Sequence, residues 1–423
     1  MPAEFRAETY QNEFLPAGTG EVHAITTVSA GEGTSATPGE RVFGILCDTS
    51  GSMEGGKIIA AKAAMSRLVE LLPADCSFFI VTGSDDAVLV CPMMRAEPQN
   101  KKQALAAIHN VRAFGGTHIS RWLGAALTQF RGVPNGVRQA LLLTDGQNDP
   151  TDDHPLGETL ALCEGKFQCD CRGVGTDWQV DQLRRIAGKL LGTTDIIPSP
   201  AHIENDFRAI LQKALSKTRS DVFLRLWTPQ GARVKFLKQV SPEIVDLTSR
   251  AREVKPQLRE YPTGAWGNGE TRDFHFCIEV APGGVGDEVL AGRVSLVYFQ
   301  AGVENKVADA RILAMWTDDE GKSTKINRVV AHYTGQAELA QSIQAGLEAR
   351  AQGDVETATV LLGKAVKIAN DSGNEATAKL LRRVVDVQDA ERGTVRLRSA
   401  VAKEDSMALE TRSTKTARIV KTS

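Results

Sequence analysis

The sequence predicts an α/β fold for residues 41–218, because short apolar runs alternate there with stretches of helical periodicity. This alternation is typical of a doubly wound, mostly parallel sheet. A second observation is a change to strict apolar–polar alternation over residues 219–330, which favours antiparallel strands. Apolar spacing of three and four residues then returns over residues 331–392 and indicates helices. A chain of 423 residues is therefore expected to contain several domains.

Strands and helices are expected in turn along residues 41–218. The run Ala140–Leu143 is apolar at every position, so its strand should be central and covered on both faces. The expected strands are Val42–Cys47, Ser77–Thr82, Ala87–Cys91, Gln139–Thr144, Phe167–Val174 and Asp195–Ile197. The expected helices are Lys57–Leu72, Gln99–His109, Ile119–Phe130, Leu156–Glu164, Val180–Leu191 and Ile203–Ser216. We therefore expect a Rossmann-like sheet with helices on both faces.

Residues 219–330 are expected to form a small antiparallel β-sandwich. Every second residue is apolar in 222–226 and again in 274–280. In the second run, His275, Cys277 and Glu279 occupy the alternate positions. Turns rich in proline and glycine separate such runs, as sandwiches require.

Residues 1–40 are expected to supply one strand and a linker. They contain six glutamates against one arginine. The segment Glu21–Ala30 is rich in β-branched residues and indicates a strand, whereas Gly31–Pro38 has the composition of a linker. A lone strand needs a sheet to join, and we expect it to complete the β-sandwich. The α/β domain would then be inserted in the β domain; otherwise the sandwich simply follows it.

The chain is expected to end in a helical domain and a tail. Helices are predicted over Ala337–Ala351, Val355–Asn370 and Asn374–Ala390, which together resemble a tetratricopeptide-like hairpin with one further helix. Residues 393–423 carry seven Lys/Arg against three Asp/Glu and few large apolar side chains. We therefore expect a flexible basic tail there.

Hydroxyl groups crowd the end of this tail. Thr411, Ser413, Thr414 and Thr416 are interleaved with basic residues. In an unfolded segment they would be accessible to a Ser/Thr kinase, and each phosphate would add negative charge. The competing interpretation is a solvated basic end without a role.

Composition argues against several classes of function. Hydrophobic residues make up 42% and charged residues 24% of the chain, as in ordinary globular proteins. A net charge of −2 gives no reason to expect nucleic acid or an anionic membrane as partner. No apolar run reaches the roughly 18 residues of a membrane span, and the first residues do not resemble a signal peptide. The seven cysteines are then expected to be reduced thiols of a cytoplasmic protein.

Three oxygen-bearing residues follow the first strand of the α/β region. Asp48, Ser50 and Ser52 leave the apolar run 42–46 and precede the helix at 57–72. Alternate residues point the same way, so these side chains should converge at the carboxyl end of the strand, where open α/β sheets bind ligands. One carboxylate with two hydroxyls is weakly charged for a calcium site but suits Mg²⁺, which retains waters and accepts a partner's oxygen.

Two later segments complete a pattern that resembles the metal-ion-dependent adhesion site of von Willebrand factor A domains. Thr117 follows two glycines and precedes the helix predicted at 119–130. Asp145 ends the apolar strand at 139–144. With Asp48, Ser50 and Ser52, all five positions of the family's motif match in order. The resemblance covers roughly residues 40–218.

The resemblance implies how a metal would be held. Ser50, Ser52 and Thr117 would ligate Mg²⁺ or Mn²⁺ directly or nearly so, while Asp48 and Asp145 would act directly or through water. A partner's Asp or Glu would fill the sixth position. Stand-alone bacterial proteins of this family are scaffolds, or adaptors beside AAA+ ATPases or Ser/Thr kinase and phosphatase systems. The chain is thus expected to bind a protein partner rather than to be an enzyme, with a second, groove-type contact from its helical domain.

Two other interpretations compete with this one. A metal-dependent phosphatase would use Asp48 as nucleophile, but related phosphatases carry a second Asp two residues later, where this chain has Ser50. A zinc site would use Cys163, Cys169 and Cys171, but Cys-x-x-Cys pairs are absent. These cysteines are therefore expected to be small core residues.

Overall fold

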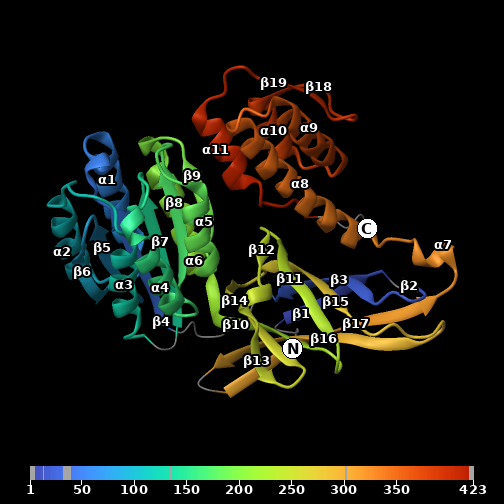
Figure 1. The fold of residues 1–423 in the computed structure, drawn as a ribbon. Coiled ribbons are helices and arrows are strands. Elements are labelled where there is room, and N and C mark those ends of the chain that lie inside the picture. Colours follow the sequence, from blue (N-terminus) through green and yellow to red (C-terminus); the bar gives the residue numbers. More distant parts are fainter. Residues whose placement is uncertain (1–4, 13, 32–39, 134–135, 301–302, 419–423) are drawn as a thin grey trace. The chain divides into compact units, whose positions relative to one another are not determined.

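The computed structural model describes residues 5–12, 14–31, 40–133, 136–300 and 303–418, and the chain divides into two compact units (Figure 1). The α/β unit comprises the described residues of Ser35–Ser220 together with Gly264–Gly267. The sandwich unit comprises those of Met1–Thr34, Asp221–Thr263 and Asn268–Ser423. Inserting an α/β domain after the first strands of a β domain produces this division.

The α/β unit is built on a six-stranded sheet in the order β6-β5-β4-β7-β8-β9. The strands are β4 (Glu40–Asp48), β5 (Cys76–Gly83), β6 (Ala87–Arg95), β7 (Gly136–Thr144), β8 (Gln168–Val174) and β9 (Thr194–Ile197). Neighbouring strands are parallel except β5 and β6, which are antiparallel. The prediction of a doubly wound, mostly parallel sheet is confirmed.

Helices pack against both faces of this sheet. They are α1 (Gly56–Leu71), α2 (Pro98–His109), α3 (Ile119–Phe130), α4 (Asp153–Cys163), α5 (Val180–Lys189) and α6 (Ile203–Leu215). On one face, Phe43 of β4 shares a buried cluster with Met65 of α1 and Phe207 of α6. On the other face, the ring of Phe79 in β5 meets Phe130 of α3 edge-on, with centroids 4.9 Å apart. Burial on both faces explains why these strands are apolar throughout.

The sheet order places the carboxyl ends of β4 and β7 beside each other. These two strands are parallel neighbours at the middle of the sheet. From β4 the chain runs outward through β5 and β6, and it returns through α3 to β7 on the other side. This reversal is the point at which open α/β sheets bind ligands.

The sandwich unit contains a five-stranded sheet, β1-β3-β15-β11-β12, and a six-stranded sheet, β13-β14-β10-β16-β17-β2. In the five-stranded sheet the strands are β1 (Phe5–Gln11), β3 (Glu21–Ala30), β11 (Arg233–Ser241), β12 (Val245–Asp246) and β15 (Thr271–Glu279). The six-stranded sheet contains β2 (Leu15–Pro16), β10 (Lys217–Trp227), β13 (Arg252–Lys255), β14 (Leu258–Gly267), β16 (Glu288–Gln300) and β17 (Val303–Thr317). In the five-stranded sheet every pair is antiparallel. In the six-stranded sheet β10–β16, β13–β14 and β16–β17 are antiparallel, whereas β17 and β2 are parallel.

The N-terminal strand joins the β domain. Strand β3 lies between β1 and β15 and is antiparallel to both. The sequence did not lead us to expect β1, because β1 is an edge strand in which Phe5 is the one fully buried residue. The expected linker Gly31–Pro38 lies, from residue 32 onward, outside the described residues.

Helices follow the sandwich strands at the end of the chain, and α8 packs on the five-stranded sheet. They are α7 (Glu320–Ser323), α8 (Arg328–Ala351), α9 (Val355–Asp371), α10 (Glu375–Val384) and α11 (Lys403–Arg412). Val330 and Tyr333 of α8 form a buried cluster with Ile25 of β3 and Val240 of β11. Helix α8 thereby covers part of the sheet face that is opposite to the sandwich core.

The helix predicted over Asn374–Ala390 is wrong in its second half. Helix α10 ends at Val384, and Val385–Asp389 forms β18, which pairs with β19 (Thr394–Leu397). Val385 and Val387 alternate with polar residues, and Gly393 adopts a φ of +69° in the connecting turn. Local β-branched alternation with a glycine turn therefore favours a hairpin over a continued helix.

The prediction of a flexible tail over residues 393–423 is also wrong for the described part, which ends at residue 418. Leu409 of α11 is fully buried in a cluster with Leu339 and Leu362. Beyond α11, the amide of Ile244 donates to Thr414 O at 2.8 Å, and that of Thr416 to Pro242 O at 3.0 Å. A few well-placed apolar residues and backbone hydrogen bonds are enough to hold a segment of mostly polar composition.

The phosphorylation hypothesis assumed that these hydroxyls lie in an unfolded tail, and the described part of the tail is folded. Thr411 and Ser413 are buried. Thr414 Oγ1 donates to Glu243 Oε1 at 2.8 Å, and Thr416 Oγ1 donates to Val240 O at 2.7 Å. A kinase would have to unfold this segment to reach these hydroxyls.

All seven cysteines are free and buried. Burial raises the pKa of Cys163 to about 12, which makes it an inert thiol. Within the described part of the chain, Cys163, Cys169 and Cys171 have no histidine or carboxylate grouped around them as a metal site would require. Among the described helices, none has the length and apolar character needed to cross a bilayer.

Candidate metal centre

The five residues expected to hold a metal lie at the carboxyl ends of β4 and β7 and in the loop before α3. Asp48 is the last residue of β4; Ser50 and Ser52 follow it, the latter within a single 3-10 turn. Thr117 lies two residues before α3, and Asp145 directly follows β7. Three segments that are remote in sequence thus meet at one edge of the sheet.

Four of these residues are linked by hydrogen bonds. Ser50 Oγ lies 3.0 Å from Ser52 Oγ, and Ser52 Oγ donates to Asp145 Oδ1 at 2.6 Å. The amide of Ser50 donates to Asp48 Oδ1 at 2.7 Å. Both aspartates are fully buried, whereas Ser52 is exposed. The carboxylates therefore form the buried part of the centre, and Ser52 lies at its solvent-exposed edge.

Thr117 belongs to the same centre, as the position of Gly146 demonstrates. A Cβ atom at Gly146 would lie 3.5 Å from Ser52 Oγ and 3.7 Å from Thr117 Oγ1. The two hydroxyls therefore flank the space beside Gly146. A larger side chain at this position would occupy that space, so glycine keeps the centre open.

The loop that carries Thr117 is fixed by backbone contacts. The amide of Gly51 donates to Gly115 O at 2.9 Å, and that of Phe114 donates to Thr49 O at 2.7 Å. Asp85 Oδ1 accepts from the amide of Gly116 at 2.9 Å. Gly115 has a φ of +79°, which a residue with a Cβ rarely adopts. These contacts hold the loop against the turn that carries Ser50 and Ser52.

Asp48 is held by hydrogen bonds, and its carboxyl is harder to ionise than a carboxyl in water. Burial raises the pKa of its carboxyl to about 6, although hydrogen bonds from Thr144 and Ser50 oppose this rise. Thr144 Oγ1 donates to Asp48 Oδ2 at 2.5 Å. This role of Thr144 was not predicted from the sequence. The position of Thr144, just before Asp145 at the end of the neighbouring strand, was the feature of the sequence that could have indicated this contact.

Lys57 is a second functional residue that the sequence analysis missed. Its Nζ forms an ion pair with Asp145 Oδ2, and its side chain is 29% exposed. Lys57 is the second residue of α1, where the helix dipole disfavours a positive charge. A lysine in the first turn therefore indicated that an anion lies nearby.

The donors of this centre fit a hard divalent cation. Its five side chains offer only oxygen: carboxylates from Asp48 and Asp145, and hydroxyls from Ser50, Ser52 and Thr117. Mg²⁺ and Mn²⁺ prefer such ligands, whereas zinc favours nitrogen and sulfur. The ion pair with Lys57 indicates that Asp145 readily accepts a cation.

An exposed aromatic side chain lies in the loop that carries Thr117. Phe114 is 60% exposed, although it precedes the glycines that position Thr117. Large aromatic residues at protein surfaces are frequent anchors of protein interfaces. The loop that carries Thr117 therefore combines a hydroxyl of the centre with an exposed apolar side chain.

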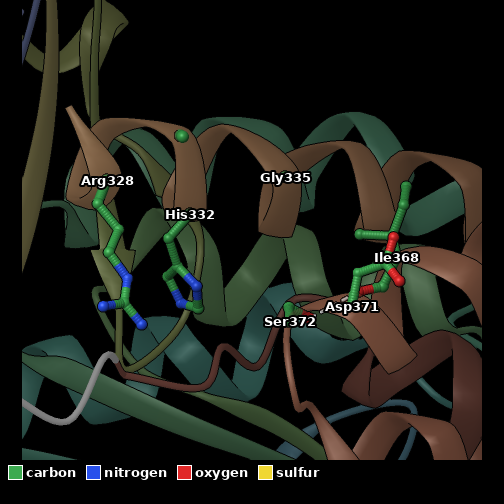
Figure 2. A pocket seen from close by; sticks show the side chains of 7 residues that line it. Arg328, His332, Gly335, Ile368, Asp371 and Ser372 are labelled. Carbon is green, nitrogen blue, oxygen red and sulfur yellow. Dashed lines mark hydrogen bonds between the residues drawn. The ribbon is translucent and has the colours of Figure 1, made fainter. Parts of the chain in front are cut away.

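The sandwich unit contains a separate pocket of about 460 Å³ between α8 and the end of α9 (Figure 2). It is lined by Arg328, Ala331, His332, Gly335, Ile368, Asp371 and Ser372. His332 Nε2 lies 2.7 Å from Ala417 O, so the folded C-terminal segment borders the same helix.

Family profiles match both units of the chain. The profile of the von Willebrand factor type A domain matches residues 43–196. The profile of the von Willebrand factor type A C-terminal domain matches residues 367–413. The second match includes α11, which the sequence analysis had assigned to a flexible tail.

Two solved structures resemble nearly the whole chain. A von Willebrand factor type A protein from Catenulispora acidiphila is 43% identical with a TM-score of 0.93, over 99% of this chain and 98% of that one. The ArnB paralog VWA2 from Sulfolobus acidocaldarius is 15% identical with a TM-score of 0.59, over 97% and 98% of the two chains. The second similarity concerns the fold alone.

Curated relatives match over shorter stretches. An uncharacterised protein of Synechocystis sp. is 29% identical over 221 residues, which are 51% of this chain and 52% of that protein. The human inter-alpha-trypsin inhibitor heavy chain H4 is 30% identical over 177 residues, 37% of this chain and 18% of its own length. The chain thus spans about half of the first relative and less than a fifth of the second.

Proposed function

Because this chain belongs to the von Willebrand factor type A family, we propose that it is a divalent-metal-dependent scaffold or adaptor that binds a protein partner. Proteins of this family often mediate protein–protein interaction. The convergence of Ser50, Ser52 and Asp145 within hydrogen-bonding distance, from two strand ends, is the observation that carries the proposal.

In the proposed site the hydroxyls of Ser50, Ser52 and Thr117 ligate Mg²⁺ or Mn²⁺. Asp48 and Asp145 bind the cation directly or through water. The bound cation supplies a positive centre that can accept one more oxygen ligand. Because the fixed charge comes from two carboxylates only, the site retains affinity for a third one from a partner.

The partner that we propose presents an Asp or Glu carboxylate to this cation. Phe114 gives the partner an apolar contact beside the metal, and the pocket along α8 offers a second binding surface in the sandwich unit. AAA+ ATPases and Ser/Thr kinase or phosphatase systems are the partner classes that we propose, in the cytoplasm of a bacterium.

A metal-dependent phosphatase with Asp48 as nucleophile is less well supported. Asp48 is fully buried, and its two oxygens accept hydrogen bonds from the amide of Ser50 and from Thr144 Oγ1. A nucleophile needs a free lone pair directed at the substrate. A phosphatase assay in Mg²⁺ and Mn²⁺ tests this alternative, because turnover that Asp48→Asn abolishes would restore it.

A metal-dependent pull-down tests the proposal. The full-length chain is immobilised and exposed to extract of its own cells, with retained proteins quantified by mass spectrometry. We expect at least one protein to be retained in millimolar Mg²⁺ and to be released by EDTA. The Thr117→Ala variant should not retain it, because one of three hydroxyl ligands is lost.

Thr128→Ala is the matched control. Thr128 is an exposed residue of α3 whose hydroxyl bonds to Gly124 O within the same helix. This variant should retain the partner like wild type. Equal retention in EDTA, or by Thr117→Ala, would contradict a metal-dependent interface.

A further inference from the structure

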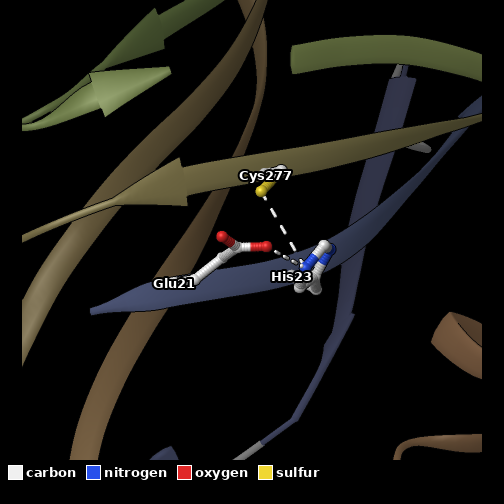
Figure 3. Close-up of side chains that lie close together, drawn as sticks. All are labelled: Glu21, His23 and Cys277. Carbon is white, nitrogen blue, oxygen red and sulfur yellow. Dashed lines mark hydrogen bonds and ion pairs between the residues drawn. The ribbon is translucent and has the colours of Figure 1, made fainter. Parts of the chain in front are cut away.

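A glutamate, a histidine and a cysteine, residue types that ligate metals, lie together in the sandwich unit on strands β3 and β15 (Figure 3). His23 and Cys277 are direct cross-strand partners in the register of these antiparallel strands. Glu21 lies two residues from His23 and therefore on the same face of the sheet. His23 and Cys277 are 254 residues apart in sequence, yet the two strands bring them together with Glu21. The three side chains offer nitrogen, sulfur and oxygen donors.

The donor atoms are close enough to share one cation. His23 Nε2 lies 2.9 Å from Glu21 Oε1 and 3.9 Å from Cys277 Sγ. All three donor atoms lie within 4.8 Å of one another. In a tetrahedral zinc site, bonds of about 2.0–2.3 Å separate ligand atoms by roughly 3.3–3.7 Å. Small side-chain rotations bring the observed distances into that range.

The surroundings orient these side chains. His23 Nδ1 lies 3.1 Å from Nε2 of His275, a buried residue on the same sheet face. Metal-binding imidazoles commonly form such an outer hydrogen bond through their second nitrogen. Lys235 forms an ion pair with Glu21 Oε2, which leaves Oε1 directed at His23. The ring of Phe236 lies 6.0 Å from that of His23 and supplies an apolar wall.

The group is partly exposed to solvent. The side chains of His23 and Glu21 are 31% and 43% exposed, whereas Cys277 is buried. Helix α8 covers the same sheet face further along, where Ile25 packs against Val330. The end that carries Glu21 stays open, so a fourth ligand can be water or an incoming molecule.

We propose that Glu21, His23 and Cys277 form a binding site for a borderline divalent cation, Zn²⁺ above all, distinct from the oxygen-lined centre at Asp48. Thiolate and imidazole ligands select Zn²⁺ over Mg²⁺, because they are softer than carboxylate and hydroxyl oxygens. Binding releases the thiol proton of Cys277 to solvent, and any proton on His23 Nε2 leaves with it. The cation then bridges β3 to β15 and anchors the N-terminal strand. Three protein ligands leave one coordination position for an exchangeable ligand.

Without a metal, separate hydrogen bonds from the two ring nitrogens of His23 to Glu21 and His275 would account for the same contacts. Cobalt(II) separates the two interpretations, because a thiolate bound to Co²⁺ gives a charge-transfer absorption band that a hydrogen-bonded thiol lacks. The reduced full-length chain is titrated with CoCl₂ in the presence of millimolar Mg²⁺. We expect the band to saturate at one equivalent and to disappear when equimolar Zn²⁺ is added.

Variants assign the band to this site. Cys277→Ser should abolish it, and His275→Gln should weaken Co²⁺ binding about 10-fold, as the loss of an outer hydrogen bond does. Cys91→Ser is the matched control, since Cys91 is equally buried but lies in β6 of the other unit. It should leave the band unchanged.

Two outcomes would overturn the proposal. The first is absence of the band in wild type, and the second is its persistence in Cys277→Ser. If Cys277→Ser does not fold, Glu21→Gln and His23→Gln decide, because both side chains are partly exposed and tolerate substitution. We expect each to weaken Co²⁺ binding at least 10-fold, and unchanged affinity in both would refute the site.

Discussion

The two units of this chain assemble polar side chains in contrasting ways. In the α/β unit, oxygen donors come from loops that follow parallel strands, and Asp48, Ser52 and Asp145 meet at the edge of the sheet. In the sandwich unit, His23 and Cys277 meet on the flat face of antiparallel strands. The first arrangement depends on loops that backbone hydrogen bonds hold together. The second is set by strand register, which makes it suited to a metal that holds two strands together.

The two groups of side chains are also expected to bind different metals. The Asp48 centre offers only hard oxygens, whereas the Glu21 centre offers sulfur, nitrogen and oxygen. Each metal is therefore expected to respond to substitutions in one unit and to ignore those in the other.

The largest expected effect tests this independence. Replacing Asp48 and Asp145 together by alanine should weaken Mn²⁺ binding by more than about 100-fold, roughly 2.7 kcal/mol. The reason is that both carboxylates of the oxygen-lined centre are lost. Mn²⁺ affinity is measured by electron paramagnetic resonance titration, with the cobalt–thiolate band recorded on the same protein. Loss of both signals together would show that the two centres are not independent.

A smaller effect is expected at Lys57, whose ammonium is paired with the buried Asp145. Lys57→Met should tighten Mn²⁺ binding about 10-fold, roughly 1.4 kcal/mol, because a competing cation is removed. Without metal the same variant should unfold more easily, by about 1–3 kcal/mol, since Asp145 loses its partner. Calorimetric titration and thermal melts measure the two changes.

Lys62→Met is the control for this variant. Lys62 lies on the same helix and donates to backbone carbonyls of His109 and Val111 rather than to a carboxylate. Its replacement should leave Mn²⁺ affinity unchanged. Weaker Mn²⁺ binding in Lys57→Met would mean that Lys57 supports the centre instead of competing with the cation.

The smallest expected effect concerns pH. Burial raises the pKa of Asp48 from 3.8 to about 6. A raised carboxyl pKa stabilises the metal-free fold below about pH 4, and this contribution is lost as the pH rises through about 6. A divalent cation binds the carboxylate and offsets that loss. The increase in melting temperature caused by Mg²⁺ should therefore be larger at pH 7.5 than at pH 5, and equal increases would contradict it.

The α/β unit could be predicted from the sequence because its signals are local. Strand and helix periods alternate along it, and the oxygen-lined centre is indicated by Asp48, Ser50 and Ser52, which lie within one turn. The residues that were not predicted act through neighbours that are distant in the sequence. Thr144 and Lys57 act through Asp48 and Asp145, and only the folded sheet brings these pairs together.

The sandwich unit was harder to predict for the same reason. Edge strand β1 buries little, and α11 contributes Leu409 to a core whose other members lie in α8, α9, α10, β18 and β19. His275 and Cys277 were visible as alternate residues of a strand, but their relation to His23 required the register of β3 against β15. The register between two strands that are distant in sequence cannot be predicted from either strand alone.

The most direct test of the Asp48 centre is a crystal of the full-length chain soaked in MnCl₂ and measured for anomalous scattering. We expect one peak about 2.0–2.3 Å from the hydroxyls of Ser50, Ser52 and Thr117, with a solvent or carboxylate oxygen completing its coordination. The Thr117→Ala variant should lose most of this peak. A manganese peak elsewhere, or none at millimolar concentration, would contradict metal-dependent partner binding at this centre.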